Sequence, residues 1–215
     1  NLSVNPLEML SDFNLTGVLT PDTYDRIVGG SPWQAERILA GSRSILVLGT
    51  GGSSFVRAFL KAPFAGEDPL DHYTILKVDD LRSSLELDGF RTAAGFYWER
   101  RDGAYADFVA LAAAAGLGTP SKLGVLVHPE FGPWFGIRAL LFTDKVLPPT
   151  TALDFDPCTG CAAPCVSACP AAAVRSPFDG VACATQRRST ITCLTSCDAR
   201  RACLFGRQYA YDRDI

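Results

Sequence analysis

The sequence predicts a mixed α/β (α+β) body followed by a small cysteine-rich domain, and three observations lead to this prediction. An apolar run at residues 44–50 (SILVLGT) ends in a glycine-rich turn, as a buried strand does. Residues 104–118 (AYADFVALAAAAGLG) carry apolar side chains at helical spacing. All eight cysteines of the 215-residue chain lie between Cys158 and Cys203. We therefore place a body at 1–150 and a second domain at 151–215.

The elements of the body follow in chain order. The glycine-rich turn leads into a short helix at 53–64, and the helix at 104–118 ends at Gly116 or Gly118. The proline-rich stretch 147–157 is a linker to the cysteines. Residues 73–80 are expected to form a strand or the beginning of a helix. A helix is expected at 85–98, with Leu85, Leu87, Phe90, Ala94 and Tyr97 on one side. Two strands are expected within 122–144, LGVLV and FGIRALLFT, joined by HPEFGPW.

Composition and charge exclude several classes of protein. Hydrophobic residues make up 47% of the chain, which is enough to build a core. The net charge is −3 and no lysine-rich run occurs, so a nucleic-acid partner is not expected. The sequence has neither an apolar run of eighteen residues nor a signal peptide. We therefore expect no membrane partner and a reducing, cytoplasmic location in which thiols stay free.

The cysteine spacing predicts iron–sulfur clusters. Bacterial ferredoxins use C-x2-C-x2-C-x3-C-P, in which the fourth cysteine ligates the other cluster. Residues 158–170 read C-x2-C-x3-C-x3-C-P, which is one residue wider. Eight thiolates are the number that two 4Fe-4S clusters need, so we predict a bacterial-ferredoxin-like domain with crossed ligation. Cys158, Cys161, Cys165 and Cys203 would hold one cluster, and Cys169, Cys183, Cys193 and Cys197 the other.

Three alternatives remain for the cysteines. Zinc could occupy two four-thiolate sites, although zinc ribbons usually offer two well-separated C-x2-C knuckles. Disulfides would need an oxidising compartment. One cluster with four uninvolved cysteines would explain the irregular spacing after Cys183.

Few other residues of the body point to chemistry. The GTGGSS stretch (49–54) lacks both phosphate-loop spacings and is best interpreted as a tight strand-to-helix turn. His128, directly after an apolar strand, is either a hydrogen-bonded structural residue or a ligand. His72 is expected in a solvated loop. Asp102 follows two arginines and either pairs with one of them or donates a proton in catalysis.

Several blocks of the sequence resemble known families. AGLGTPSKLGVLVHPEFGPWFGIRALLFTDKVLPP (115–149), followed by the cysteine run, resembles epoxyqueuosine reductases and reductive dehalogenases, which place a cobalamin-binding domain before a two-cluster ferredoxin domain. FYWERRDG (96–103) and LGVLVHPEFGPWFGIRALL (123–141) resemble CblC-type cobalamin-processing proteins even more, and residues 44–64 resemble an early strand and helix of that group. The resemblance implies a nitroreductase-like body.

The same resemblance implies a cofactor and its pocket. A base-off corrinoid would lie between the two domains, although a nitroreductase-like body could also accept a flavin. Asp102 stands where epoxyqueuosine reductases keep a catalytic aspartate. The pocket residues carried over are His128, Gly132 and Trp134, together with Arg100 and Arg138, which match arginines that contact glutathione in CblC-type proteins.

Three functions follow from these observations. The first is a corrinoid reductase or cobalamin-processing protein, in which two 4Fe-4S clusters pass electrons from a low-potential donor to cobalamin, so that the upper ligand is removed or the cobalt reduced. The second is a ferredoxin-like electron carrier without a corrinoid. The third is a cobalamin-dependent reductase of the epoxyqueuosine reductase type.

Overall fold

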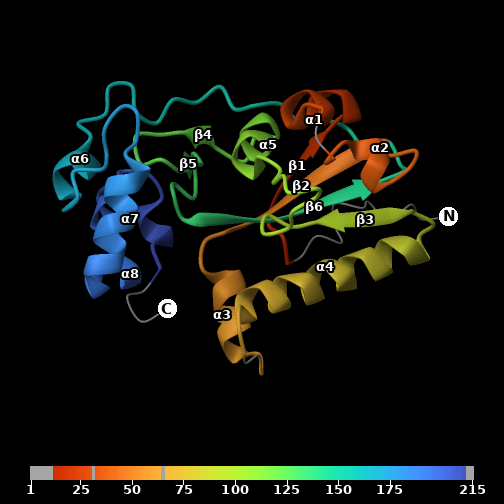
Figure 1. The fold of residues 1–215 in the computed structure, drawn as a ribbon, viewed down its shortest axis with the longest axis horizontal. Helices are drawn as coiled ribbons and strands as arrows, with labels where there is room; N and C mark the ends of the chain where they lie inside the picture. Colours follow the sequence, from red (N-terminus) through yellow and green to blue (C-terminus); the bar gives the residue numbers. More distant parts are fainter. Residues whose placement is uncertain (1–11, 31, 64–65, 212–215) are drawn as a thin grey trace.

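The centre of the molecule is a four-stranded antiparallel sheet with the strand order β1-β2-β6-β3 (Figure 1). The computed structural model describes residues 12–30, 32–63 and 66–211. Every residue of β2 is buried, as the apolar run at 44–50 predicted. The strands of the sheet are β1 (Leu15–Leu19), β2 (Ser44–Gly51), β6 (Phe135–Thr143) and β3 (Thr92–Gly95).

Helices cover both faces of the sheet, and alternate residues of β2 enter two hydrophobic cores (Figure 1). Leu46 and Leu48 face α3 and α4, whereas Ile45 and Val47 face α1, α2 and α5. This burial on both sides explains why β2 is continuously apolar. The helices of the body are α1 (Pro21–Val28), α2 (Ala35–Ile38), α3 (Ser54–Lys61), α4 (Pro69–Leu87) and α5 (Phe108–Ala114).

The prediction of a helix at 85–98 is wrong. Residues 73–80, left open between strand and helix, belong to α4, which ends at Leu87. Gly89 follows with a φ of +79°, and the amide of Phe90 donates to the carbonyl of Leu85, which closes a Schellman-type cap. Residues 92–95 then form β3 at the edge of the sheet. Pairing with β6 overrides the helical preference of the alanines.

Two further predictions need correction. The helix expected at 104–118 begins only at Phe108, because the Asp107 side chain accepts a hydrogen bond from Ala110 N and caps it. Its predicted stop at Gly116 is confirmed, with a φ of +81°. Of the two strands expected within 122–144, FGIRALLFT is confirmed as β6, but the first shrinks to β5 (Leu126–Val127), which pairs with β4 (Thr119–Pro120).

The structure also tests the predictions for the helix at 53–64, the GTGGSS stretch and His72. The short helix expected at 53–64 is confirmed as α3. Of the GTGGSS stretch, residues 49–51 end β2 and only residues 52–53 form the tight strand-to-helix turn, with Gly52 at a φ of +72°. His72 is exposed as expected, but it lies in the first turn of α4 rather than in a loop.

The linker and the cysteine-rich part follow β6. Residues 147–157 form no helix or strand, as predicted, yet Thr150 fixes the linker to the body by accepting from Val18 N and donating to Ala115 O. Between residues 151 and 211 the described segments are helical and include no strand, so a bacterial-ferredoxin-like fold is not shown. These helices are α6 (Pro164–Ala168), α7 (Gly180–Ser189), α8 (Ile191–Thr195), α9 (Asp198–Ala202) and the 3-10 helix η2 (Arg207–Tyr209). No described helix is long and apolar enough to cross a membrane.

Candidate functional site

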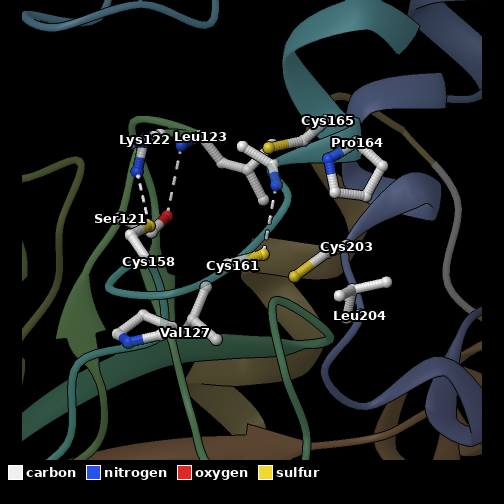
Figure 2. Close-up of a pocket in the computed structure, with 12 residues that line it drawn as sticks. Ser121, Lys122, Leu123, Val127, Cys158, Cys161, Pro164, Cys165, Cys203 and Leu204 are labelled. Atoms are coloured by element: carbon white, nitrogen blue, oxygen red, sulfur yellow. Dashed lines mark hydrogen bonds between the residues drawn. The ribbon is translucent and has the colours of Figure 1, made fainter.

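The eight cysteines line two separate cavities, four in each. The first cysteine cavity, shown in Figure 2, is lined by Cys158, Cys161, Cys165 and Cys203. The second cysteine cavity, of about 430 Å³, is lined by Cys169, Cys183, Cys193 and Cys197. These are the two sets that the crossed arrangement predicts, and Cys169 leaves its neighbours in the sequence to join the second. Ligation itself stays a prediction.

The sulfur atoms of the first cavity lie among backbone N–H donors and apolar groups. Lys122 N donates to Cys158 Sγ at 3.4 Å, and Ala163 N donates to Cys161 Sγ at 3.3 Å (Figure 2). Burial raises the pKa of the Cys165 thiol, and the neighbouring Cys203 adds to this shift. A cluster would replace the thiol protons, and the N–H donors would then stabilise the thiolates.

The described cysteines are not gathered tightly around a single point. All eight thiols are free. Among the described residues, no three Cys, His, Asp or Glu side chains are close enough together to hold one metal ion. A zinc ion would draw four sulfurs to about 2.3 Å from a single atom. The choice among clusters, zinc and disulfides therefore stays a prediction.

The body completes the first cavity through the loop between β4 and β5. Ser121, Lys122 and Leu123 come from this loop and line the cavity. Leu123 also joins a small hydrophobic cluster with Cys165, Val174 and Ala199. The loop therefore belongs to the core of the cysteine-rich part as much as to the body.

Two Phe-Gly pairs lock the body to the cysteine-rich part. Gly132 has a φ of +58°, and a Cβ there would lie 2.1 Å from the carbonyl oxygen of Phe205. Gly206 has a φ of +64°, and a Cβ there would lie 2.1 Å from the carbonyl oxygen of Phe131. Only glycine permits both the backbone conformation and this approach. We call the contact of residues 131–132 with 205–206 the glycine seam.

Trp134 extends this contact toward the second cavity. Its ring is 4% exposed and lies 4.4 Å from the Arg200 guanidinium and 5.4 Å from the ring of Tyr211. Arg200 also donates to the carbonyl oxygen of Pro133 through Nε at 3.0 Å. Trp134 lines the second cysteine cavity, so the expected cofactor residue lies beside the cysteines.

His128 shapes the loop before the glycine seam. Its Nδ1 accepts hydrogen bonds from the backbone N–H groups of Glu130 (3.1 Å) and Phe131 (3.2 Å), so Nε2 carries the proton. The backbone of His128 also exchanges two hydrogen bonds with Gly132. Burial lowers the pKa of His128, and Glu130 opposes the shift. These contacts favour the structural interpretation of this histidine.

Protonation of His128 is expected to weaken the loop. Because the pKa is lowered in the folded state, the unfolded chain binds the proton more readily, and stability falls as pH drops through the unfolded value of about 6.5. The melting temperature should therefore decrease less between about pH 7.5 and 5.5 in His128→Asn, whose side-chain oxygen can accept the same bonds, than in the parent protein. His72→Asn, at an exposed position, is the control. Equal profiles for all three proteins would contradict this role.

Arg138 lies at an irregularity in β6. Leu48 pairs with Ala139 and Gly49 with Ile137, so Arg138 is the extra residue of a β-bulge. Bulges re-aim side chains and are frequent beside active sites.

The guanidinium of Arg138 is half-buried and forms no ion pair with a described carboxylate. Nε donates to Thr50 Oγ1 at 2.8 Å, and the guanidinium lies 4.6 Å from the centre of the Phe55 ring. Burial lowers the pKa of Arg138, and Tyr211 and Tyr97 oppose this. Its other N–H groups have no hydrogen-bond partner among the described residues, so they can bind an acceptor.

Asp102 and Arg100 lie on the surface. Asp102 and Gly103 have φ values of +47° and +81° and form the tip of a tight turn closed by two hydrogen bonds between Arg101 and Ala104. Arg101 pairs with Glu99 at 3.9 Å rather than with Asp102. Arg100 is exposed and stacks on the ring of Tyr105. No described contact joins Arg100 to Arg138, so the structure does not bring the two predicted glutathione contacts together.

The sequence analysis missed several residues of the site. Lys122, Leu123 and Arg200 line the cavities, and Gly206 completes the glycine seam. Phe-Gly occurs three times in the sequence, at 131–132, 135–136 and 205–206, so the pair alone could not have identified Gly206.

The fold and part of the sequence are similar to those of epoxyqueuosine reductases. The chain matches no protein-family model. Over 71 residues it is 44% identical to an epoxyqueuosine reductase from Synechococcus sp. (strain CC9605), a stretch that covers 32% of this chain and 21% of that protein. The epoxyqueuosine reductase of Streptococcus thermophilus superposes with a TM-score of 0.61 at 16% identity, covering 99% of this chain and 67% of that one.

A second solved structure, of an epoxyqueuosine reductase with a modified tRNA-Tyr stem loop, gives a TM-score of 0.63 at 18% identity over 97% of this chain and 66% of that one. The chain thus spans about two thirds of the length of the solved reductases and matches about a fifth of the curated relative. The expected resemblance to epoxyqueuosine reductases is confirmed in fold and in part of the sequence. A CblC protein from C. elegans is also among the similar solved structures, with a TM-score of 0.48 at 15% identity over 70% of this chain and 72% of that one.

Proposed function

We propose that this chain is an iron–sulfur reductase of the epoxyqueuosine reductase type. The observation that carries the proposal is the division of eight free cysteines into two sets of four, each around its own cavity. The body to which they are attached has the fold of epoxyqueuosine reductases. Two cavities with four thiols each match the ligand requirement of two 4Fe-4S clusters.

The cysteine sets would hold the clusters, and residues of the body would influence their reduction potentials. Lys122 N supplies a hydrogen bond to a sulfur of the first set, and Leu123 excludes water from it. Hydrogen bonds and burial of this kind set the reduction potential of a cluster. When bound, the clusters supply electrons one at a time, and a corrinoid supplies a strongly reducing cobalt centre.

Arg138 is the predicted pocket residue that best fits a corrinoid. Its remaining N–H donors can bind amide or carboxylate oxygens on the edge of such a ring. His128 and Gly132 fit less well, since hydrogen bonds and the glycine seam already occupy them. A flavin would compete for the same surface, and glutathione and the low-potential donor remain proposed partners.

The test begins with anaerobic reconstitution. We expect about eight irons and about eight sulfides per chain, and a shift of the visible spectrum toward the base-off form when cob(II)alamin is added. The loaded protein should then reduce the epoxide in an epoxyqueuosine-containing RNA stem loop. Fewer than about four irons per chain would end the two-cluster proposal. An unchanged spectrum at saturating cob(II)alamin would end the corrinoid part.

A second candidate is corrinoid reduction or upper-ligand removal without an RNA substrate. The position of Asp102 favours it, because this residue is exposed at the tip of a turn whose geometry explains the Asp-Gly sequence by itself. An electron carrier without a corrinoid would show clusters but no spectral response to cob(II)alamin.

Asp102→Asn separates the two candidates. Asparagine keeps the positive φ of the turn, so the melting temperature and iron content should not change. If Asp102 is the proton donor to the substrate, as we expect for an epoxyqueuosine reductase, turnover of the stem loop should fall at least ~100-fold. Removal of the upper ligand from a cobalamin should continue at the parent rate. Unchanged stem-loop turnover would leave Asp102 with the turn as its only role.

A further inference from the structure

Helices α7 and α8 expose both apolar and cationic side chains. Val181, Ile191 and Leu194 are 78%, 75% and 57% exposed. Arg187 and Arg188 are exposed in the last turn of α7 and have no hydrogen bond or ion pair with any described residue. We call these five residues the α7–α8 face. Its aliphatic groups lie uncovered, Arg187 acts electrostatically on the Cys183 thiol, and Arg188 has no partner among the described residues. Uncovered aliphatic groups beside a free cation are the composition of a docking surface.

The α7–α8 face adjoins the second cysteine cavity. Arg187 and Leu194 belong to the face and also line that cavity. Cys197 of the second set is exposed, whereas Cys165 of the first set is buried. The second set is therefore the one that an external protein can approach.

We propose that the α7–α8 face docks a small acidic protein that carries one electron at a time. The inference rests on the proposed function, because such a carrier is needed only if the second cysteine set holds a cluster. In each encounter the reduced carrier loses one electron and that cluster gains it, and no covalent bond forms or breaks. Complexes of this kind are small and short-lived, and complementary charge speeds their formation.

The chemistry of the face selects this partner over nucleic acid. Phosphates would also be attracted to Arg187 and Arg188. However, the exposed apolar residues of the face are aliphatic, and none is an aromatic ring on which a base could stack. Exposed aliphatic groups together with exposed arginines suit a protein surface on which carboxylates surround a small apolar centre.

Matched charge variants test the proposal. Arg188→Glu/Ile191→Glu changes two exposed residues of the face that do not line the cavity. Arg26→Glu/Leu87→Glu makes the same change of charge and polarity at exposed positions on α1 and α4, on the body rather than on the helices of the cysteine-rich part (Figure 1). Both variants are reconstituted anaerobically, and iron content and melting temperature are compared with those of the parent.

The probe is an acidic flavodoxin. Binding of its oxidised form is measured at low salt, and the rate at which its reduced form reduces the protein is followed by stopped-flow absorbance. We expect the face variant to lose about tenfold in affinity and in rate, and the loss to become smaller at high salt, which screens the charge of Arg188→Glu but does not restore the apolar contact of Ile191. The body variant should stay within about twofold of the parent, which is the limit we set for a change remote from the site.

Each outcome has a separate meaning. A low iron content in the parent protein would remove the proposed function and this inference with it. Full iron content, with equal flavodoxin binding and rates in both variants, would overturn the docking site alone. If the face variant instead loses affinity for an RNA stem loop but not for flavodoxin, the face is a nucleic-acid site and the proposal is wrong.

Discussion

Replacing Cys165 by alanine is expected to remove about half of the iron, leaving about four of about eight atoms per chain. Cys165 lines the first cysteine cavity, so the cluster of the second set should remain. Cys203→Ala should give the same result, and so should the double variant Cys165→Ala/Cys203→Ala, because both residues belong to one set. Iron and sulfide analysis after anaerobic reconstitution measures this directly.

The sharper test uses two cysteines that are close in sequence but lie in different cavities. Cys165→Ala/Cys169→Ala should lose nearly all iron, because Cys169 belongs to the second cavity. The pair Cys165/Cys203 is the matched control with the same number of thiols removed. If Cys165→Ala/Cys169→Ala kept about four irons while Cys165→Ala/Cys203→Ala kept none, the sets would be wrong.

Gly206→Ala is expected to destabilise the protein by about 3 kcal/mol, from the strain of a positive φ and from a clash with the carbonyl oxygen of Phe131. For a chain of this size the melting temperature should fall by about 6–12 °C. Iron should also be lost to a chelator more quickly, because the glycine seam joins the body to the part that carries the cysteines.

Gly89→Ala is the matched control for this prediction. Gly89 has a φ of +79°, but a Cβ there would meet nothing within 4 Å. Gly89→Ala should destabilise the protein only through the strain of the backbone conformation, by about 1 kcal/mol. The difference between the two variants therefore measures the close approach across the seam. Equal losses would mean that the backbone conformation, and not the contact, requires glycine at position 206.

Local patterns were sufficient where burial decides the structure. The apolar run of β2 and the FGIRALLFT strand were predicted because both lie in the middle of the sheet and are covered on two sides. The segment at 92–95 was misassigned, because only its pairing with β6 makes it a strand. Gly89, the residue that ends α4, was visible in the sequence.

The candidate site also has features that the sequence could predict and features that it could not. The cysteine spacing predicted two sets of four, and the same two groups line the two cavities, while their ligation of clusters stays a prediction. Spacing could not reveal that Leu123 completes the first cavity or that Arg200 stacks on Trp134, because these contacts join residues far apart in the chain. The block around HPEFGPW was identified as important from resemblance. The structure shows it at the junction with the cysteine-rich part, in contact with Phe205 and Gly206.

The backbone amide of Lys122, which reaches Cys158 across the junction, bears on how the cysteine-rich part can be transplanted. A fragment that begins at the linker would lack this amide. It would also lack Leu123, which belongs to the hydrophobic cluster of the cysteine-rich part. The smallest fragment of the cysteine-rich part worth grafting onto another protein therefore begins upstream of Lys122 and must carry both halves of the glycine seam.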